Sequence, residues 1–93
     1  MIETNRSGTI TTGGTSQLLC NANEFRVSMS VQNLSSGDIW INRGATSSAA
    51  NPAIKIPSGA LYEFPKMQNG YVYGGVLSIY GATTGQEFTA WEG

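Results

Sequence analysis

The stretch over residues 25–42 constrains the fold more than any other part of the chain. Its first half alternates apolar and polar side chains, and a period of two is typical of a β-strand with one buried face. Residues 34–37 then have the composition of a turn, and residues 38–42 form a second short β-rich run. We therefore predict a β-hairpin at the centre of an all-β domain. The side chains expected to face the core are those of Phe25, Val27, Met29 and Val31.

The composition favours the same fold class. Gly, Ser, Thr and Asn make up 38 of the 93 residues, a mixture that suits short strands and tight turns and disfavours helices. A second hairpin is predicted between residues 76–80 and 87–92, and a long loop over residues 43–53. Other strands are predicted over residues 8–12, 15–20, 54–56, 61–64 and 71–80.

Seven or eight short strands at this spacing predict a single-domain antiparallel β-sandwich, jelly-roll-like in character. The domain is expected to span residues 8–93. Residues 1–7 are polar, and we predict that they form a flexible N-terminal arm.

The charged residues exclude several functions. Six acidic and five basic residues give a formal charge of -1, and no basic stripe is present, so nucleic acid is not an expected partner. The chain has no histidine, which rules out the usual catalytic triads. Cys20 is the only cysteine, so neither an internal disulfide nor a zinc site is expected, and we predict that its side chain is buried. We predict no enzyme activity, no metal and no cofactor.

No stretch of the chain approaches the roughly 20 apolar residues that a membrane-spanning helix needs. The N-terminal residues are polar and lack the apolar run of a signal peptide. We therefore predict no membrane association and synthesis in the cytoplasm without a secretion signal.

The large aromatic side chains are the best candidates for a functional surface. If Ile39 and Ile41 face the core, Trp40 faces away from it, and the same parity turns Tyr80 and Trp91 outward. Outward aromatic side chains serve as anchors in protein interfaces or as stacking platforms for sugars, and a third possibility is a second layer of the core. The predicted interface set consists of Trp40, Tyr80, Trp91 and Arg43.

Three segments resemble a group of small structural proteins of tailed bacteriophages. They are VQNLSSGDIWINRGATSSA, AIKIPSGALYEF and GGVLSIYGATTGQEFTAWEG, and the resemblance covers residues 25–93. It implies a β-sandwich or jelly-roll-like virion protein, often a capsid decoration (cement) protein that acts as a multimer. Other members of this group lie at the head–tail junction or on the tail. The resemblance includes no catalytic residues.

Our leading hypothesis from the sequence is a capsid decoration protein that stabilises the phage head by bridging neighbouring shell subunits. It would be made in the host cytoplasm and incorporated into the virion, as a homo-oligomer (a trimer is favoured) bound to the major capsid protein or another virion protein. One alternative is a head–tail or tail-associated structural protein. Another is a carbohydrate-binding β-sandwich module that uses Trp40, Tyr80 or Tyr71.

Overall fold

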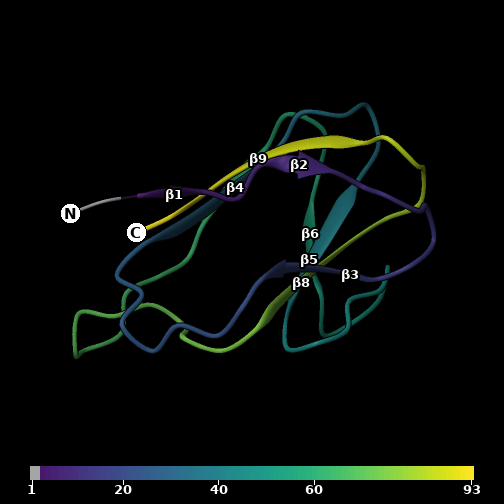
Figure 1. Ribbon diagram of the computed structural model, residues 1–93. Helices are drawn as coiled ribbons and strands as arrows, with labels where there is room; N and C mark the ends of the chain where they lie inside the picture. Colours follow the sequence, from purple (N-terminus) through teal and green to yellow (C-terminus); the bar gives the residue numbers. More distant parts are fainter. Residues whose placement is uncertain (1–2) are drawn as a thin grey trace.

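The computed structural model describes residues 3–93, and within that range the chain forms nine β-strands and no helix (Figure 1). All strand pairs are antiparallel, and the strands form two sheets. The five-stranded sheet contains β1 (Thr4–Asn5), β2 (Gly8–Thr9), β9 (Glu87–Glu92), β4 (Met29–Asn33) and β7 (Leu61–Glu63). The four-stranded sheet has the order β3 (Gln17–Cys20), β8 (Leu77–Gly81), β5 (Ile39–Arg43) and β6 (Ile54–Ile56).

The strand pairs are nested around the connection between β5 and β6. β5 pairs with β6, β4 with β7, β3 with β8, and β2 with β9, as in one long two-stranded ribbon. The ribbon is rolled up, which brings β9 beside β4 and β8 beside β5. This is the topology of a jelly roll, and it confirms the predicted antiparallel β-sandwich. β1 and β2 both pair with β9 along the same edge, so they are two parts of one interrupted edge strand. Counted as one strand, they reduce the total to eight, within the predicted seven or eight.

The core lies between the two sheets and follows the period of two in the strands. The side chains of Ile39 and Ile41 on β5 are fully buried. The side chains of Leu77 and Ile79 on β8 are also fully buried. Full burial of each such side chain stabilises the fold by about 1.5–3 kcal/mol. The other buried apolar residues are Ile10, Leu19, Cys20, Met29, Val31, Ile56, Phe64, Val72, Phe88 and Ala90.

The two hairpins predicted from the sequence are wrong. β4 and β5 lie in different sheets, as do β8 and β9, so both connections cross between the layers. The side chain of Asn33, fully buried at the end of β4, shapes the first crossing, because its amide nitrogen donates to the carbonyls of Gly37 (2.6 Å) and Ile56 (2.8 Å). The side chain of Gln86 shapes the second, because its amide nitrogen donates to the Asp38 carbonyl (3.1 Å) and its oxygen accepts from the amide of Thr83 (3.0 Å).

The predicted facing of residues 25–27 is also wrong. The side chain of Phe25 is 69% exposed, whereas Arg26 is fully buried. The amide of Arg26 donates to the carbonyl of Asn23 (3.1 Å), which closes a turn just before β4. Because the backbone turns here, the alternation holds only from Met29 onward, where Met29 and Val31 do face the core.

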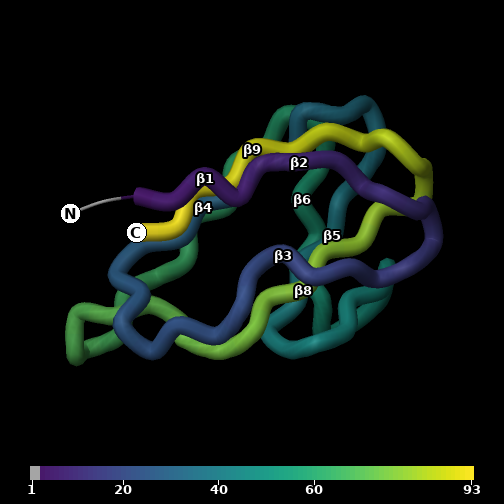
Figure 2. The backbone as a smooth tube through the Cα atoms, viewed as in Figure 1, coloured from purple at the N-terminus to yellow at the C-terminus, as the bar shows by residue number. Residues whose placement is uncertain are grey.

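The polar N-terminal segment runs beside the C-terminal strand (Figure 2). Thr4 and Asn5, which we predicted to lie in a flexible arm, pair in register with Glu92 and Trp91 of β9. Residues 1 and 2 of that arm lie outside the described residues. Residues 4 and 5 therefore lie beside the C-terminal strand at one edge of the five-stranded sheet.

Candidate functional site

Two residues of the predicted interface set, Trp40 and Tyr80, lie directly opposite each other. Trp40 on β5 is in register with Tyr80 on β8 on one side and with Lys55 on β6 on the other. Their neighbours Ile41 and Ile79 face the core, so the aromatic pair lies on the outer face of the four-stranded sheet. Both aromatic side chains are half-buried. The outward orientation agrees with the parity of the sequence, and the interface role stays a prediction.

The long connection between β5 and β6 covers part of this outer face. The Ser47 amide donates to the hydroxyl of Ser16 (2.9 Å), and the Ser47 hydroxyl donates to the carbonyl of Trp40 (3.2 Å). The side-chain amide of Asn42 donates to the carbonyl of Thr46 (2.7 Å). The loop is therefore fixed against β5 and leaves the Trp40–Tyr80 pair partly accessible.

The other two residues of the set lie elsewhere. Trp91 on β9 is 40% exposed on the outer face of the five-stranded sheet, on the opposite side of the sandwich. The guanidinium of Arg43 lies over the rings of Tyr73 (5.8 Å to the centroid) and Phe64 (6.0 Å). The set predicted from the sequence therefore does not form a single surface.

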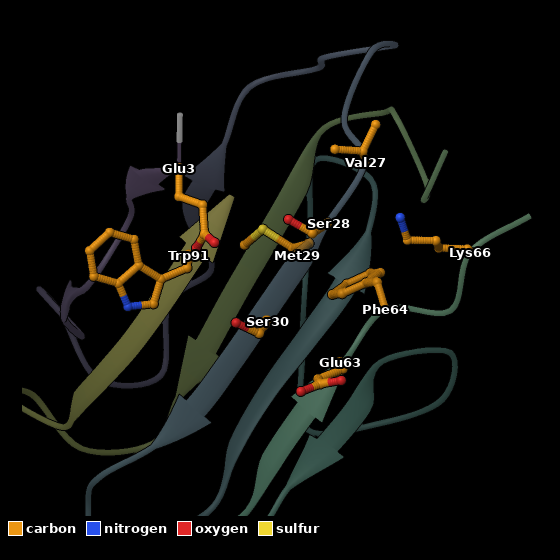
Figure 3. Close-up of a pocket in the computed structure, with 9 residues that line it drawn as sticks. All are labelled: Glu3, Val27, Ser28, Met29, Ser30, Glu63, Phe64, Lys66 and Trp91. Atoms are coloured by element: carbon orange, nitrogen blue, oxygen red, sulfur yellow. The ribbon is translucent and has the colours of Figure 1, made fainter. Parts of the chain in front are cut away.

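Trp91 borders a groove of about 350 Å³ (Figure 3). Ser30 on β4 pairs with Trp91 on one side and with Glu63 on β7 on the other, so these three residues form a row across the sheet. Glu3 lies next to Trp91, and Lys66 lies across the groove from it. We call this feature the Trp91 groove, and its lining is completed by Val27, Ser28, Met29 and Phe64.

The sequence predicted that Trp91 faces outward, but it did not predict which residues lie beside it. Ser30 alternates with Met29 and Val31, which is the one local signal that it shares the outer face. Glu3, Glu63 and Lys66 come from distant parts of the chain, and only the pairing of β1, β4, β7 and β9 brings them to the groove.

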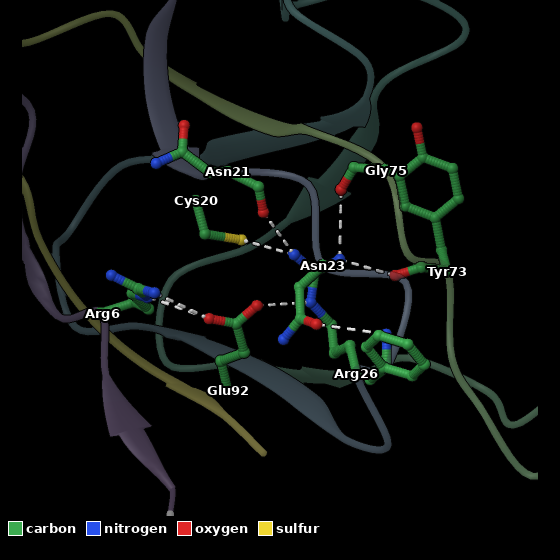
Figure 4. Close-up of polar contacts among 9 residues, drawn as sticks. Arg6, Cys20, Asn21, Asn23, Arg26, Tyr73, Gly75 and Glu92 are labelled. Atoms are coloured by element: carbon green, nitrogen blue, oxygen red, sulfur yellow. Dashed lines mark hydrogen bonds and ion pairs between the residues drawn. The ribbon is translucent and has the colours of Figure 1, made fainter.

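A second set of polar residues lies inside the molecule, around Arg26 (Figure 4). We call it the Arg26 cluster, and it consists of Arg26, Glu92, Cys20 and the carbonyls of Asn21, Tyr73 and Gly75. The Nε atom of Arg26 donates to Oε2 of Glu92 (2.7 Å). Its two terminal nitrogens donate to the carbonyls of Tyr73 (2.6 Å), Gly75 (3.2 Å) and Asn21 (2.8 Å) and to the sulfur of Cys20 (3.3 Å). These bonds use the whole donor capacity of the guanidinium.

Glu92 joins the Arg26 cluster to the N-terminal segment. Its Oε1 atom accepts from Nε of Arg6 (3.0 Å), and the Arg6 side chain is partly exposed. Burial raises the pKa of the Glu92 carboxyl, but the hydrogen bonds and charges of Arg26 and Arg6 lower it more, so that its pKa lies below the ordinary value. Burial also raises the pKa of the Cys20 thiol, and the positive charge of Arg26 partly opposes this.

The Arg26 cluster is a structural feature. Arg26 has no accessible surface and no free donor with which to bind a substrate. Its partners belong to the segment after β3, the segment before β8 and the C-terminal strand, and so it fixes three parts of the chain to one another. Cys20 is buried, as predicted from the sequence.

Among residues 3–93, no group of three or more Cys, Asp or Glu side chains is placed to hold a metal ion. The same part of the chain contains no helix that is long and apolar enough to span a membrane. No protein-family model, curated protein or solved structure matches this chain.

Proposed function

We propose that this protein is a structural component of a tailed-phage virion that decorates the capsid and bridges neighbouring shell subunits. The observation that carries the proposal is the cross-strand pair of Trp40 and Tyr80 on the outer face of the four-stranded sheet. In this proposal the protein acts as a homo-oligomer in the virion, and this face binds the major capsid protein.

The chemistry of the face supports a protein partner. Tyr and Trp are the side chains most enriched at the energetic centres of protein interfaces. Leu18 on the adjacent strand β3 is 56% exposed and is in register with Ser78, two residues from Tyr80, so it adds an aliphatic side chain to the same face. A protein interface of standard size buries about 800 Å² on each partner. This is a modest share of the 5139 Å² surface of the chain.

The jelly-roll topology agrees with the resemblance to phage structural proteins. Eight-stranded jelly rolls occur in viral capsid domains and also in lectin domains. Because one fold serves many functions, the proposal rests on the aromatic pair together with this topology. The alternative location at the head–tail junction or on the tail would use the same aromatic pair against a different virion protein.

The proposal can be tested by co-sedimentation with empty shells of the major capsid protein from the same genome, in parallel with purified tails. We expect the protein to sediment with the shells. We expect Trp40→Ala and Tyr80→Ala to weaken this binding by roughly 30-fold or more, the effect of losing an interface anchor. Phe25→Ala is the matched control, because Phe25 is an aromatic residue that is 69% exposed, precedes β4 of the other sheet and contacts the ring of Tyr71.

Thermal unfolding of the isolated variants separates binding from folding. If Trp40→Ala costs the isolated protein as much free energy of unfolding as it costs in free energy of shell binding, the indole is part of the core and the proposed interface is wrong. Sedimentation with tails and not with shells would move the protein to the tail. Light scattering that gives a strict monomer at all concentrations would contradict the homo-oligomer.

A further inference from the structure

The Trp91 groove lies on the face of the sandwich opposite to the proposed shell contact. We propose that the Trp91 groove is a binding site for a neutral pyranose saccharide, with the indole of Trp91 as its stacking platform. This inference goes beyond the proposed function and stands on different residues.

The row of residues across the sheet has the layout that a sugar ring requires. The ring carbons of a pyranose present C–H groups that stack on an aromatic face, while its hydroxyls extend sideways in the ring plane. Trp91 is 40% exposed and offers the aromatic face. Ser30 and Glu63 follow on the next two strands in register, at successive spacings of about 4.8 Å. The backbone positions of these polar residues therefore lie about 5 and 10 Å from that of Trp91, a span that one or two sugar units can cover.

Within residues 3–93, the polar side chains of the groove leave their hydrogen-bonding capacity unused. None of the side chains of Glu3, Ser28, Ser30, Glu63 and Lys66 forms a hydrogen bond with another side chain or with the backbone of residues 3–93. Among the described residues, the carboxylates of Glu3 and Glu63 and the ammonium of Lys66 also form no ion pair. Sugar hydroxyls both donate and accept, so they match a mixed set of carboxylates, hydroxyls and an ammonium.

The charges define which saccharides are expected. Glu3 lies beside the indole and Glu63 on the same face two strands away, and two carboxylates accept from hydroxyl donors but repel an acidic sugar. Among residues 3–93, Lys66 is the one positive group of the lining against two carboxylates, so these side chains carry a net negative charge. This favours neutral hexoses over uronic or sialic acids. The volume of about 350 Å³ is at the lower end of the range for small-ligand sites, which suits one or two sugar units.

The sequence raised sugar binding for Trp40, Tyr80 or Tyr71, and the structure moves it to Trp91. The ring of Tyr71 is in edge contact with Phe25 (6.4 Å between centroids), and Trp40 lies beside the fixed β5–β6 loop. Trp91 alone among these residues borders a groove that carries two carboxylates. The site residues of this proposal are Trp91, Glu3, Glu63, Ser30 and Lys66.

The indole N–H signals of the two tryptophans provide a direct test in the ¹⁵N-labelled chain of 93 residues. We would titrate glucose-, galactose- and mannose-containing oligosaccharides, and sialyllactose as the acidic probe, up to about 10 mM, a range that detects millimolar affinity. We expect one of the neutral probes to shift the Trp91 signal while the Trp40 signal stays in place. Sialyllactose should cause no shift.

Variants test the role of each group. Trp91→Ala should abolish binding, Trp91→Tyr should retain part of it, and Glu63→Gln should weaken it at least several-fold with an unchanged melting temperature. Leu34→Ala, an exposed side chain on the β4–β5 connection, is the control and should bind as the original chain does.

Three outcomes would overturn the proposal. These are the absence of a Trp91 shift with every neutral probe, shifts in the backbone signals of groove residues that persist in Trp91→Ala, and a preference for sialyllactose. A change of oligomeric state in Trp91→Ala without any saccharide binding would assign the groove to contact between copies of this chain instead. Because Trp40 and Tyr80 are unaltered in all these variants, failure here leaves the result of the shell-binding experiment unchanged.

Discussion

Substitution of Arg26 by alanine should destabilise the fold more than any other change of a charged residue. The substitution removes five hydrogen bonds and leaves the partly buried carbonyls of Asn21, Tyr73 and Gly75 without their donor. It also takes one of two cationic partners from Glu92, which is only 4% exposed. Removing one member of a buried ion pair costs about 3–5 kcal/mol.

This loss is large for a domain of 93 residues, whose total free energy of unfolding is expected to be about 5–14 kcal/mol. At this size a change of 1 kcal/mol shifts the melting temperature by about 4–8 °C, so Arg26→Ala should lower it by at least about 12 °C. Arg26→Lys keeps the charge but cannot reproduce the planar fork of donors, so it should recover only part of the loss.

Urea unfolding monitored by tryptophan fluorescence measures these differences. The control is Lys55→Ala, which removes an ion pair with Asp38 (3.7 Å) between two exposed side chains and should cost less than about 1 kcal/mol. In a double-mutant cycle, Arg26→Ala and Glu92→Ala should be non-additive by about 1–3 kcal/mol, because the two side chains are in direct contact. A cost below about 1 kcal/mol for Arg26→Ala, or strict additivity in the cycle, would refute this account of the Arg26 cluster.

Two further predictions follow from the buried groups and the close backbone contacts. The lowered pKa of Glu92 contributes stability that is fully present above the pKa of the carboxyl in the unfolded chain and is lost as the pH falls through its lower folded-state pKa. Melting temperatures measured across acidic pH should therefore fall less steeply for Glu92→Gln than for the original chain, and parallel curves would contradict this. Gly13→Ala should cost about 1–3 kcal/mol, because its new Cβ would lie 2.5 Å from the backbone oxygen of Ala82. Gly8→Ala, whose Cβ would meet no atom closer than 3.6 Å, should be nearly neutral in the same unfolding assay, and equal effects of the two would show that the backbone yields.

The facing of side chains within a strand could be predicted from the sequence because it depends only on neighbouring residues. Ile39 and Ile41 are buried and Trp40 between them faces outward, as their alternation predicts. Trp91 is exposed beside the buried Ala90 for the same reason. A strand has a period of two wherever it lies in the fold, so these orientations needed no knowledge of the partner strands.

The pairing of strands could not be predicted in this way. The turn-like segment at residues 34–37 suits a hairpin as well as a crossing between sheets, and the crossing forms because buried Asn33 bonds across to Ile56. Likewise, the turn before β4 and the partners of the Arg26 guanidinium reverse the expected facing of residues 25 and 26. The turn itself is a local contact between Arg26 and Asn23. The crossing depends on Ile56, 23 positions from Asn33, and the burial of Arg26 depends on Glu92, 66 positions away.

For the candidate surfaces, too, the orientation of side chains could be predicted from the sequence, whereas their neighbours could not. The sequence by itself determined an all-β domain and the outward orientation of Trp40, Tyr80 and Trp91, because alternation along a strand is local. Only the tertiary structure decided that Trp40 and Tyr80 lie side by side, and that Trp91 lies on the opposite face beside a groove with Glu63. The physical reason is that rolling the ribbon into two sheets assigns each strand its neighbours through contacts between distant segments, which no local pattern encodes.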